Sequence, residues 1–453
     1  MPHSLSAPPH LAPGLIVSAA SSGSGKTVLT LGLVRALRRR GLVVRTAKTG
    51  PDYIDPAFHA AASGHPCLSL DTWGMRPETL LTSLRWLDGD MTVAEGVMGL
   101  FDGAFVDDRL ADGSTAALAL RTGFPVLFVL DVSGQSASAA AVAKGFQTFR
   151  PGVTLSGLIL NRVGGPRHEA AIRQALAEAV PDVPVLGSVP RAKALDLPHR
   201  HLGLIQAQEH ADLEAFLEAA ADTVTAHVDL EAVMALSRPP RPPAIARHRP
   251  FPPPPGQRVA VARDIAFAFA YPGLLRGWQE RGAELVPFSP LADESPAPDA
   301  DAVYLPGGYP ELHAGRLAAA ERFRQGMREA AARGATIIGE CGGYMTLGDA
   351  LTDADGQTHP MLGLLPVETS FARRKLHLGY RRVVTLTDSG FGPAGTPLRG
   401  HEFHYASIVR EDESTADRLF RAHDATGTAL PAMGLRRGSV AGSFLHMIDL
   451  EDF

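Results

Sequence analysis

Cysteine is scarce in this chain, and its scarcity excludes one broad class of protein. The 453 residues contain two cysteines, Cys67 and Cys341. Two cysteines cannot form the disulfide framework that holds small secreted domains together, so we expect a reducing, cytoplasmic environment. The N-terminal segment also lacks a basic region followed by an apolar stretch, so we expect no secretory signal peptide.

Long apolar runs and an excess of basic charge are missing as well. No stretch approaches the roughly 18 apolar residues that a membrane-spanning helix needs, so we expect no membrane partner. Lys and Arg number 43 against 48 Asp and Glu, a formal net charge of -5. Without a dominant basic stripe, nucleic-acid binding is not expected. The length predicts two or three domains.

A proline-rich segment divides the chain into two halves. Residues 237–257 contain S-R-P-P-R-P-P and F-P-P-P-P-G, which cannot form a helix or a central strand and predict an extended, semi-rigid linker. In the first half, strand-like apolar runs alternate with helical patterns, which predicts a doubly wound parallel α/β domain. The second half also carries strand and helix patterns, and we expect a second α/β domain there. We therefore expect a flexible lead over residues 1–13, a first domain over 14–236 and a second over 258–453.

A phosphate-binding loop opens the first domain. The apolar run Leu15–Ser18 predicts a strand, S-S-G-S-G-K-T follows it, and a helical pattern runs to Gly41. This order is the context that a nucleotide phosphate loop requires. Ala20 stands where the usual pattern has its first glycine, and a small residue suffices there; a capped turn without nucleotide is the alternative. The residues predicted to bind ATP in this loop are Gly23, Ser24, Gly25, Lys26 and Thr27, with Lys26 on the phosphates and Thr27 on Mg²⁺.

Carboxylates follow two further predicted strands of this domain. Asp52 and Asp55 lie in a Gly/Pro-rich loop, Glu95 ends a short apolar strand, and Asp102 lies in the glycine-rich loop after it. Because parallel strands end at one edge of a sheet, we predict that these carboxylates lie beside the phosphate loop, where Mg²⁺ needs oxygen ligands. Solvated loop residues are the alternative. Asn161, at another strand end, is a candidate to contact adenine or to cap the loop.

Four motifs of this half together resemble the cobyrinic/hydrogenobyrinic acid a,c-diamide synthase family. They are K-T-G-P-D-Y-I-D-P-x-F-H, E-G-V-M-G-L-F-D-G, L-I-L-N-R-V and R-H-L-G-L (Arg200–Leu204). The resemblance implies a phosphate-loop fold similar to that of dethiobiotin synthetase, in which ATP activates a carboxylate. It implies a metal site made of Thr27, Asp52 and Glu95. It also implies a carboxylate or acyl-phosphate site made of Asp52, Tyr53, Asp55 and Asp102.

A cysteine at a predicted strand-to-helix turn is the main feature of the second domain. The apolar run A-T-I-I-G leads to Cys341 and a glycine pair. Such a turn places the thiol beside backbone N–H groups and a helix N-terminus, which favours its ionisation. A small packing residue is the alternative, and packing is the role we expect for Cys67. Upstream lies the glycine loop P-G-G-Y-P-E; far downstream a predicted strand ends at His446.

These three pieces resemble a class I glutamine amidotransferase. The resemblance implies that Cys341 attacks the glutamine amide, that His446 carries the proton, and that backbone N–H groups near Gly308 and Gly342 form the oxyanion hole. The class carries a glutamate two positions after the histidine, where this chain has Ile448. A Cys–His dyad, or another orienting residue, is therefore expected.

A local basic cluster and a histidine-rich motif also belong to this half. Arg374 and Lys375 are candidate contacts to a polycarboxylate substrate, with a solvated basic face as an equal alternative. The motif G-H-E-F-H-Y matches the family, but the sequence assigns it no role.

The two resemblances imply one reaction. It is the ATP- and glutamine-dependent amidation, through acyl phosphates, of the a and c carboxylates of hydrogenobyrinic or cobyrinic acid in cobalamin biosynthesis. Mg²⁺ is the expected cofactor, and a cytoplasmic homodimer is the expected assembly. The alternatives are another glutamine-dependent tetrapyrrole amidase (cobyric acid synthase or Ni-sirohydrochlorin a,c-diamide synthase) and, from another class, a partitioning-type ATPase with an inactive glutaminase-like module.

Overall fold

The computed structural model describes residues 11–191, 199–200, 203–204, 206–210, 212–241 and 251–452. The chain forms two compact units: one lies within residues 11–241, and the other comprises 251–452 together with Gly74–Arg76. Residues 242–250 of the predicted linker lie outside the described residues, as do residues 1–10 of the predicted lead and His201 and Leu202 of the R-H-L-G-L motif.

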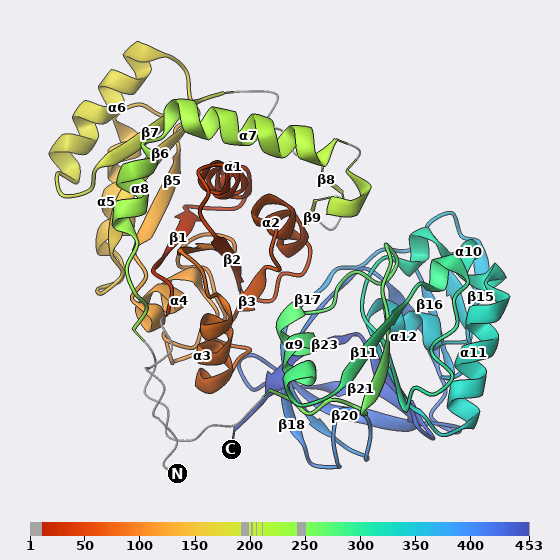
Figure 1. Ribbon diagram of the computed structural model, residues 1–453. Helices are drawn as coiled ribbons and strands as arrows, with labels where there is room; N and C mark the ends of the chain where they lie inside the picture. Colours follow the sequence, from red (N-terminus) through yellow and green to blue (C-terminus); the bar gives the residue numbers. More distant parts are fainter. Residues whose placement is uncertain are drawn as a thin grey trace, which may run out of the picture. The chain divides into compact units, whose positions relative to one another are not determined.

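A parallel sheet forms the centre of the first unit (Figure 1). In spatial order, its described strands are β3 (Leu68–Leu70), β2 (Val44–Thr49), β4 (Met91–Glu95), β1 (Gly14–Ala19), β5 (Val126–Asp131), β6 (Leu155–Val163) and β7 (Val185–Pro190). Neighbouring strands pair in parallel throughout. Leu15, Ile16 and Val17 are at most 1% exposed, because helices cover both faces of such a sheet.

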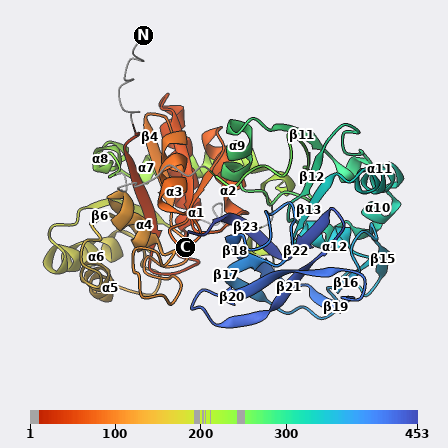
Figure 2. The ribbon, with the colours of Figure 1, turned by 90° about the horizontal axis from the view of Figure 1, so that it is seen from below.

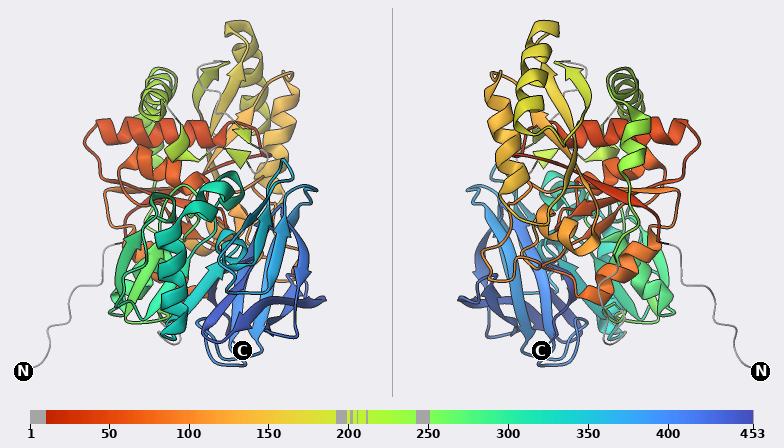
Figure 3. Two further views of the ribbon diagram at one scale, coloured as in Figure 1. Left: turned by 90° about the vertical axis from the view of Figure 1, so that its right-hand side faces the viewer. Right: turned by 90° about the vertical axis from the view of Figure 1, so that its left-hand side faces the viewer.

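Helices connect and cover these strands. They are α1 (Lys26–Arg39), α2 (Asp55–Ser63), α3 (Pro77–Trp86), α4 (Thr115–Thr122), α5 (Ser138–Thr148), α6 (Pro166–Ala179), α7 (Leu213–His227) and α8 (Leu230–Leu236). Figure 1 shows α1 nearly end-on, below α7, which is seen from the side. Figure 3 shows α1 from the side and α7 nearly end-on, so the two helices cross at a steep angle. Gly32 permits this crossing, because a Cβ there would lie 2.6 Å from the Ala220 carbonyl oxygen. Short elements β8 (His199–Arg200), β9 (Gly203–Leu204) and η2 (Ala207–Glu209) precede α7.

The second unit is built on a larger, mixed sheet (Figure 2). Its described strands, in spatial order, are β11 (Glu284–Phe288), β10 (Arg258–Ala262), β12 (Ala302–Leu305), β13 (Thr336–Glu340), β22 (Val440–Ser443), β21 (Ala429–Arg437), β20 (Asp417–Asp424), β17 (His377–Thr385), β18 (Pro397–His404) and β23 (Leu445–Leu450). The strands from β11 to β22 pair in parallel, and those from β22 to β23 pair antiparallel.

Helices and a small second sheet complete this unit. The helices are α9 (Pro272–Glu280), α10 (Ala314–Ala319), α11 (Glu321–Ala332) and α12 (Gly342–Leu347), with 3₁₀ turns η3 (Pro290–Ala292) and η4 (Pro310–Leu312). The small sheet consists of β15 (Thr358–Pro360), β14 (Ala350–Thr352), β16 (Val367–Ser370) and β19 (Ser407–Glu411). The α/β class predicted for both halves is confirmed, with a parallel sheet in the first unit and a mixed sheet in the second. In the described ranges, no helix is long and apolar enough to cross a bilayer.

Candidate active sites

The loop between β1 and α1 has the geometry of a phosphate cradle. Gly23 and Gly25 take left-handed backbone angles, with φ of 78° and 88°. A Cβ at Gly25 would lie 2.3 Å from Asn161 Nδ2, so only glycine fits. Asn161 Nδ2 donates to the Ser24 carbonyl oxygen at 2.9 Å, and Lys26 Nζ donates to the Ser21 carbonyl oxygen at 3.0 Å. Asn161 therefore holds the loop, and its contact with adenine stays a prediction.

Glu95, at the end of β4, is the centre of a buried polar cluster beside this loop. Its Oε1 accepts hydrogen bonds from Thr27 Oγ1 at 2.6 Å and from Lys48 Nζ at 2.9 Å. His59 Nε2 lies 2.6 Å from its other oxygen. Burial opposes ionisation of Glu95, but Lys48 and then His59 outweigh it, so the pKa of this carboxyl lies below its usual value. Glu95 is therefore ionised, and it contacts Thr27, the side chain predicted to bind Mg²⁺.

Asp52 and Asp55 meet the same lysine. Lys48 Nζ lies 2.6 Å from Asp55 Oδ2 and 3.7 Å from Asp52 Oδ2. Asp52 also accepts from the backbone N–H groups of Ile54 and Asp55, at 2.8 and 3.1 Å. Burial, and then the charge of Asp55, raise the pKa of Asp52 to about 6. Tyr53, between the two aspartates, is buried. The strand ends thus bring Asp52, Asp55 and Glu95 together, as the sequence predicted.

Asp102 has a different local role. Its Oδ2 accepts from the Gly99 N–H at 2.8 Å, which closes the turn after β4. The turn packs on the phosphate loop: Leu100 N–H donates to the Ala19 carbonyl at 3.0 Å, and a Cβ at Gly99 would lie 2.5 Å from the Ala20 carbonyl oxygen. Asp102 thereby fixes one wall of the cradle, and its negative charge acts on Lys26.

The oxygen groups around Thr27 fit a magnesium ion. Mg²⁺ prefers hard oxygen ligands and is commonly held by one or two carboxylates together with nucleotide phosphates, not by a cage of protein groups. Thr27 Oγ1 and the Glu95 carboxylate supply such ligands, and Asp52, whose side chain is 25% exposed, lies near the same lysine. Throughout the described ranges, no group of three or more His, Cys, Asp or Glu forms a metal cage by itself. That arrangement suits a cation that enters with a nucleotide.

Cys341 is held at a strained turn between β13 and α12. Its backbone has φ 48° and ψ -103°, a conformation that costs a non-glycine residue about 1–3 kcal/mol. Its N–H donates to the Ser443 carbonyl oxygen at 2.8 Å. Gly343 permits the turn, since a Cβ there would lie 2.0 Å from the Leu305 carbonyl oxygen. Strain at one cysteine with neighbouring glycines is typical of a nucleophile placed at the tip of an elbow.

His446, on β23, lies next to Cys341 and is fully buried. A Cβ at Gly307 would lie 2.3 Å from His446 Cε1 and 3.3 Å from Cys341 Cβ, so the imidazole and the cysteine meet over Gly307. A Cβ at Gly342 would lie 2.9 Å from the Gly308 nitrogen. The two glycines predicted to form the oxyanion hole are therefore neighbours beside the thiol.

The pair is neutral in this structure. Burial, and then the negative charge of Glu311, raise the pKa of Cys341, although the Gly342 N–H opposes the shift. Burial, followed by His401 and His404, lowers the pKa of His446 to about 3. The helix N-terminus, which the sequence predicted to favour ionisation of Cys341, is outweighed by burial, because α12 is short.

The G-H-E-F-H-Y motif lies on β18, beside the strand of His446. His401 is the antiparallel partner of His446. Glu402 accepts from Arg381 Nε at 2.8 Å and from His404 Nε2 at 3.0 Å. Burial opposes ionisation of Glu402, but His404 and Arg381 outweigh it and lower its pKa to about 2. Ile448, two positions after the histidine, is a buried apolar residue.

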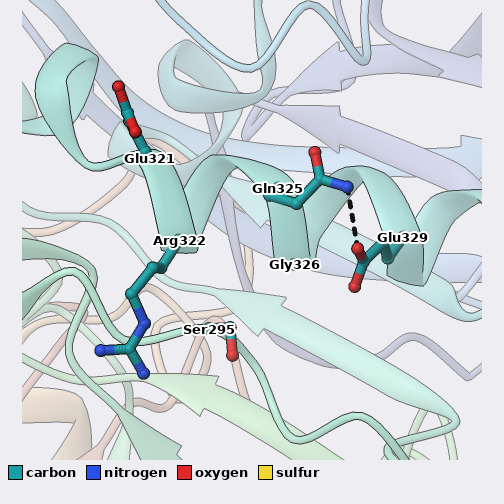
Figure 4. Close-up of a pocket in the computed structure, with 6 residues that line it drawn as sticks. All are labelled: Ser295, Glu321, Arg322, Gln325, Gly326 and Glu329. Atoms are coloured by element: carbon teal, nitrogen blue, oxygen red, sulfur yellow. Dashed lines mark hydrogen bonds between the residues drawn. The ribbon is translucent and has the colours of Figure 1, made fainter.

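Two features lie on the surface of the second unit. Arg374 and Lys375 are exposed, in the segment between β16 and β17. A shallow depression of about 380 Å³ lies along α11 and is lined by Ser295, Glu321, Arg322, Gln325, Gly326 and Glu329. Figure 4 shows these lining residues and the hydrogen bond that joins Gln325 to Glu329. None of the predicted site residues lines this depression.

Sequence reasoning missed four residues of the two sites. Lys48 and His59 complete the Glu95 cluster, and both stand in the motif K-T-G-P-D-Y-I-D-P-x-F-H, which was the available signal. Gly307 and Glu340 complete the surroundings of Cys341. Their neighbours in sequence were recognised, but only the fold shows what each of the two contacts. Cys67 is buried, as expected of a packing residue.

These two sites define a protein that joins a phosphate-loop nucleotide-binding domain to a glutamine amidotransferase domain. Residues 15–205 match the CobQ/CobB/MinD/ParA nucleotide binding domain, and residues 258–452 match the CobB/CobQ-like glutamine amidotransferase domain.

Similar proteins extend over nearly the whole chain. The chain is 59% identical over 443 residues to the hydrogenobyrinate a,c-diamide synthase of Brucella abortus, covering 96% of this chain and 98% of that protein. Proteins of the same name from Sinorhizobium sp. and Rhodobacter capsulatus are 54% and 51% identical, with 99% and 98% of their lengths covered by 96% of this chain. The chain belongs to the hydrogenobyrinate a,c-diamide synthase family, which confirms the predicted family and fold.

Proposed function

We propose that this protein converts the a and c carboxylates of hydrogenobyrinic acid into amides, using ATP and glutamine. The observation that carries the proposal is its identity of 51–59% with proteins of that name over nearly their full length. Both halves of the reaction have candidate sites in the chain: the Thr27–Glu95 cluster at the phosphate loop and the Cys341–His446 pair.

The first unit activates the carboxylate. A carboxylate oxygen of the substrate attacks the γ-phosphorus of ATP, ADP leaves, and an acyl phosphate with a good leaving group is formed. The loop N–H groups and Lys26 bind the phosphates. Thr27, Glu95 and Asp52 would hold Mg²⁺, whose positive charge would offset the negative charge of the phosphate oxygens. Lys48, held by Asp55 and Glu95, presents a cation to the acyl phosphate site, where Tyr53 and Asp102 shape the wall.

The second unit supplies ammonia. Cys341 Sγ attacks the carboxamide carbon of glutamine while His446 takes the thiol proton and passes it to the leaving ammonia. The N–H groups of Gly308 and Gly342 stabilise the oxyanion, a device worth about 3–4 kcal/mol for one donor. Water then cleaves the thioester to release glutamate. The ammonia attacks the acyl phosphate, phosphate leaves, and the amide remains.

Several further features complete the proposal. We place the domain limits at residues 14–236 and 258–453, with a linker between them. The matched regions 15–205 and 258–452 support these limits. Arg374 and Lys375 are candidate contacts to the substrate carboxylates. A homodimer in the cytoplasm is the proposed assembly.

The test is a product assay with the purified chain. ATP, Mg²⁺ and glutamine are supplied with hydrogenobyrinic acid, cobyrinic acid or Ni-sirohydrochlorin in separate reactions, and products are mapped by mass spectrometry. Two carboxyl-to-amide conversions on hydrogenobyrinic acid are expected, at the a and c positions. Amidation of another ring alone, or glutamine-independent ATP turnover without any amide, contradicts the proposal.

A further inference from the structure

Glu340 is a buried carboxyl group directly before Cys341. It is 1% exposed. Its Oε2 accepts from the Tyr304 O–H at 2.8 Å, and its Oε1 accepts from the Met447 N–H at 3.2 Å. Both donors are neutral. Because an unpaired charge in a protein interior is costly, a carboxyl kept in this position without a cationic partner calls for an explanation.

Its two hydrogen bonds join strands that carry the two reacting side chains. Met447 follows His446 on β23, whereas Glu340 ends β13, the strand that delivers Cys341. In the sheet, β23 pairs with β18. The strands that separate β13 from β23 are β22, β21, β20, β17 and β18. Among the described strands, no ladder of backbone hydrogen bonds therefore joins β23, which carries His446, to β13, which ends just before Cys341. The Glu340–Met447 hydrogen bond makes that link directly, and Figure 2 shows β13, β22 and β23 gathered at this place.

On the N-terminal side of His446, the short connection from β22 to β23 holds the backbone close to the Cys341 turn. Ser443, at the end of β22, accepts from the Cys341 N–H, and Phe444 alone separates β22 from β23. The Glu340 carboxyl holds the backbone on the far side of His446, at Met447. The imidazole is thus flanked by two backbone attachments to the Cys341 turn.

We propose that Glu340 is a positioning residue of the glutaminase site, holding His446 against Cys341 through the Met447 backbone. This inference rests on the proposed glutaminase role of the Cys341–His446 pair. Class I enzymes carry a glutamate two positions after the histidine, where this chain has Ile448. Glu340 supplies an acidic group that orients His446 from another strand. Glu340 acts on the strand that carries the imidazole, and an ionised carboxylate is the stronger acceptor for the Met447 N–H.

The ionisation of Glu340 makes the role measurable. Burial raises its pKa to about 7, against the opposing effects of Tyr304 and the Met447 N–H. Since the pKa of His446 is about 3 and that of Cys341 is raised, neither of the reacting groups titrates near pH 7. The other titratable groups around this network are Tyr271 beside Tyr304, Glu311 and Glu402 near Cys341, and His401 and His404 near His446. The glutaminase rate is therefore expected to rise as pH increases through about 7.

The experiment measures glutamate release from glutamine by the full chain between pH 5 and 9, with ammonia-supported amidation as a separate readout. Release is the informative reaction because Asp52 in the other site has a pKa of about 6. Glu340→Gln keeps the shape and an oxygen acceptor, so the inflection near pH 7 should disappear with KM for glutamine unchanged. Tyr304→Phe removes a donor to the carboxylate and should move the inflection to higher pH. Glu340→Leu removes the acceptor and should lower kcat at least about tenfold.

Two controls separate positioning from general stability. Glu411→Gln alters a part-buried tyrosine–glutamate pair, since Glu411 accepts from the Tyr344 O–H at 2.6 Å; its glutaminase pH profile should match that of the wild type. Tyr304→Phe added to Glu340→Gln should bring no further shift. An unchanged profile in Glu340→Gln, or an unchanged kcat in a folded Glu340→Leu, overturns the proposal. A wild-type chain that releases no glutamate instead contradicts the proposed function itself.

Discussion

Gly307→Ala tests where the structure holds the imidazole of His446. The new Cβ would lie 2.3 Å from His446 Cε1, 3.1 Å from Nε2 and 3.3 Å from Cys341 Cβ. Gly307 does not have a left-handed φ, so alanine brings no backbone strain and only the collision remains. Carbon atoms in contact lie about 3.5 Å or more apart. The Gly307 backbone belongs to the loop that follows β12, so we expect the loop to stay in place and the His446 ring to move by about 1 Å.

A displacement of this size has a predictable effect on one half of the reaction. Misplacing a reacting group by about 1 Å can cost about 100-fold in rate, so kcat for glutamine-supported amidation should fall by about that factor. Ammonia-supported amidation should stay at the wild-type rate. Because the alanine overpacks a buried site, the free energy of unfolding should fall by about 1–3 kcal/mol. Both rates are measured on the same preparation, together with thermal unfolding.

Gly145→Ala is the matched control. It lies in α5, where a Cβ meets no atom within 4 Å, and alanine in a helix interior is neutral or stabilising by up to about 1 kcal/mol. Both rates should match the wild type. A Gly307→Ala variant with a normal glutamine-supported rate would refute the placement of His446 as the proton carrier. Equal loss of both rates would attribute the effect to the fold instead.

Three further predictions address the division of labour between the sites. Cys341→Ala should reduce glutamine-supported amidation and glutamate release to background while ammonia still supports amidation; loss of both in a folded variant contradicts the scheme. Glu95→Gln should slow amidation with either nitrogen source and lower stability by about 3–5 kcal/mol at neutral pH, because Lys48 loses a buried partner. Since the pKa of Glu95 is lowered from 4.5, its stabilisation is present above that pH and is lost on acidification, so the difference in Tm between wild type and variant should shrink toward pH 3. Gly25→Ala, with φ of 88° and a Cβ 2.3 Å from Asn161 Nδ2, should weaken ATP binding at least about tenfold by calorimetry and leave glutamate release unchanged.

Local patterns were sufficient for much of the first site. A strand, a glycine loop and Gly-Lys-Thr lie in sequence order, so the cradle around Lys26 is formed by contiguous residues. The carboxylates Asp52 and Glu95 could be placed beside it because each follows a parallel strand, and parallel strands end at one edge. Lys48 and His59 could not be assigned in the same way. A lysine inside a strand and a histidine on a helix carry no signal of their shared contact with Glu95.

The same limit applies to the second site. The residues around Cys341 predicted a nucleophile elbow, and the strained φ of 48° is consistent with it. The effects of burial and of Glu311 on the Cys341 thiol could not be predicted, because both depend on the packing of the whole unit.

The sequence by itself determined the two-part α/β organisation, the phosphate loop, the candidate nucleophile and base, and the family. These depend on contiguous motifs and on periodicity, which short stretches of chain express independently. Only the tertiary structure decided how His446 meets Cys341 over Gly307, and that Glu340 links their strands. Those contacts join residues about a hundred positions apart through the curvature of a mixed sheet. No local pattern encodes that curvature, because it results from the packing of all the strands together.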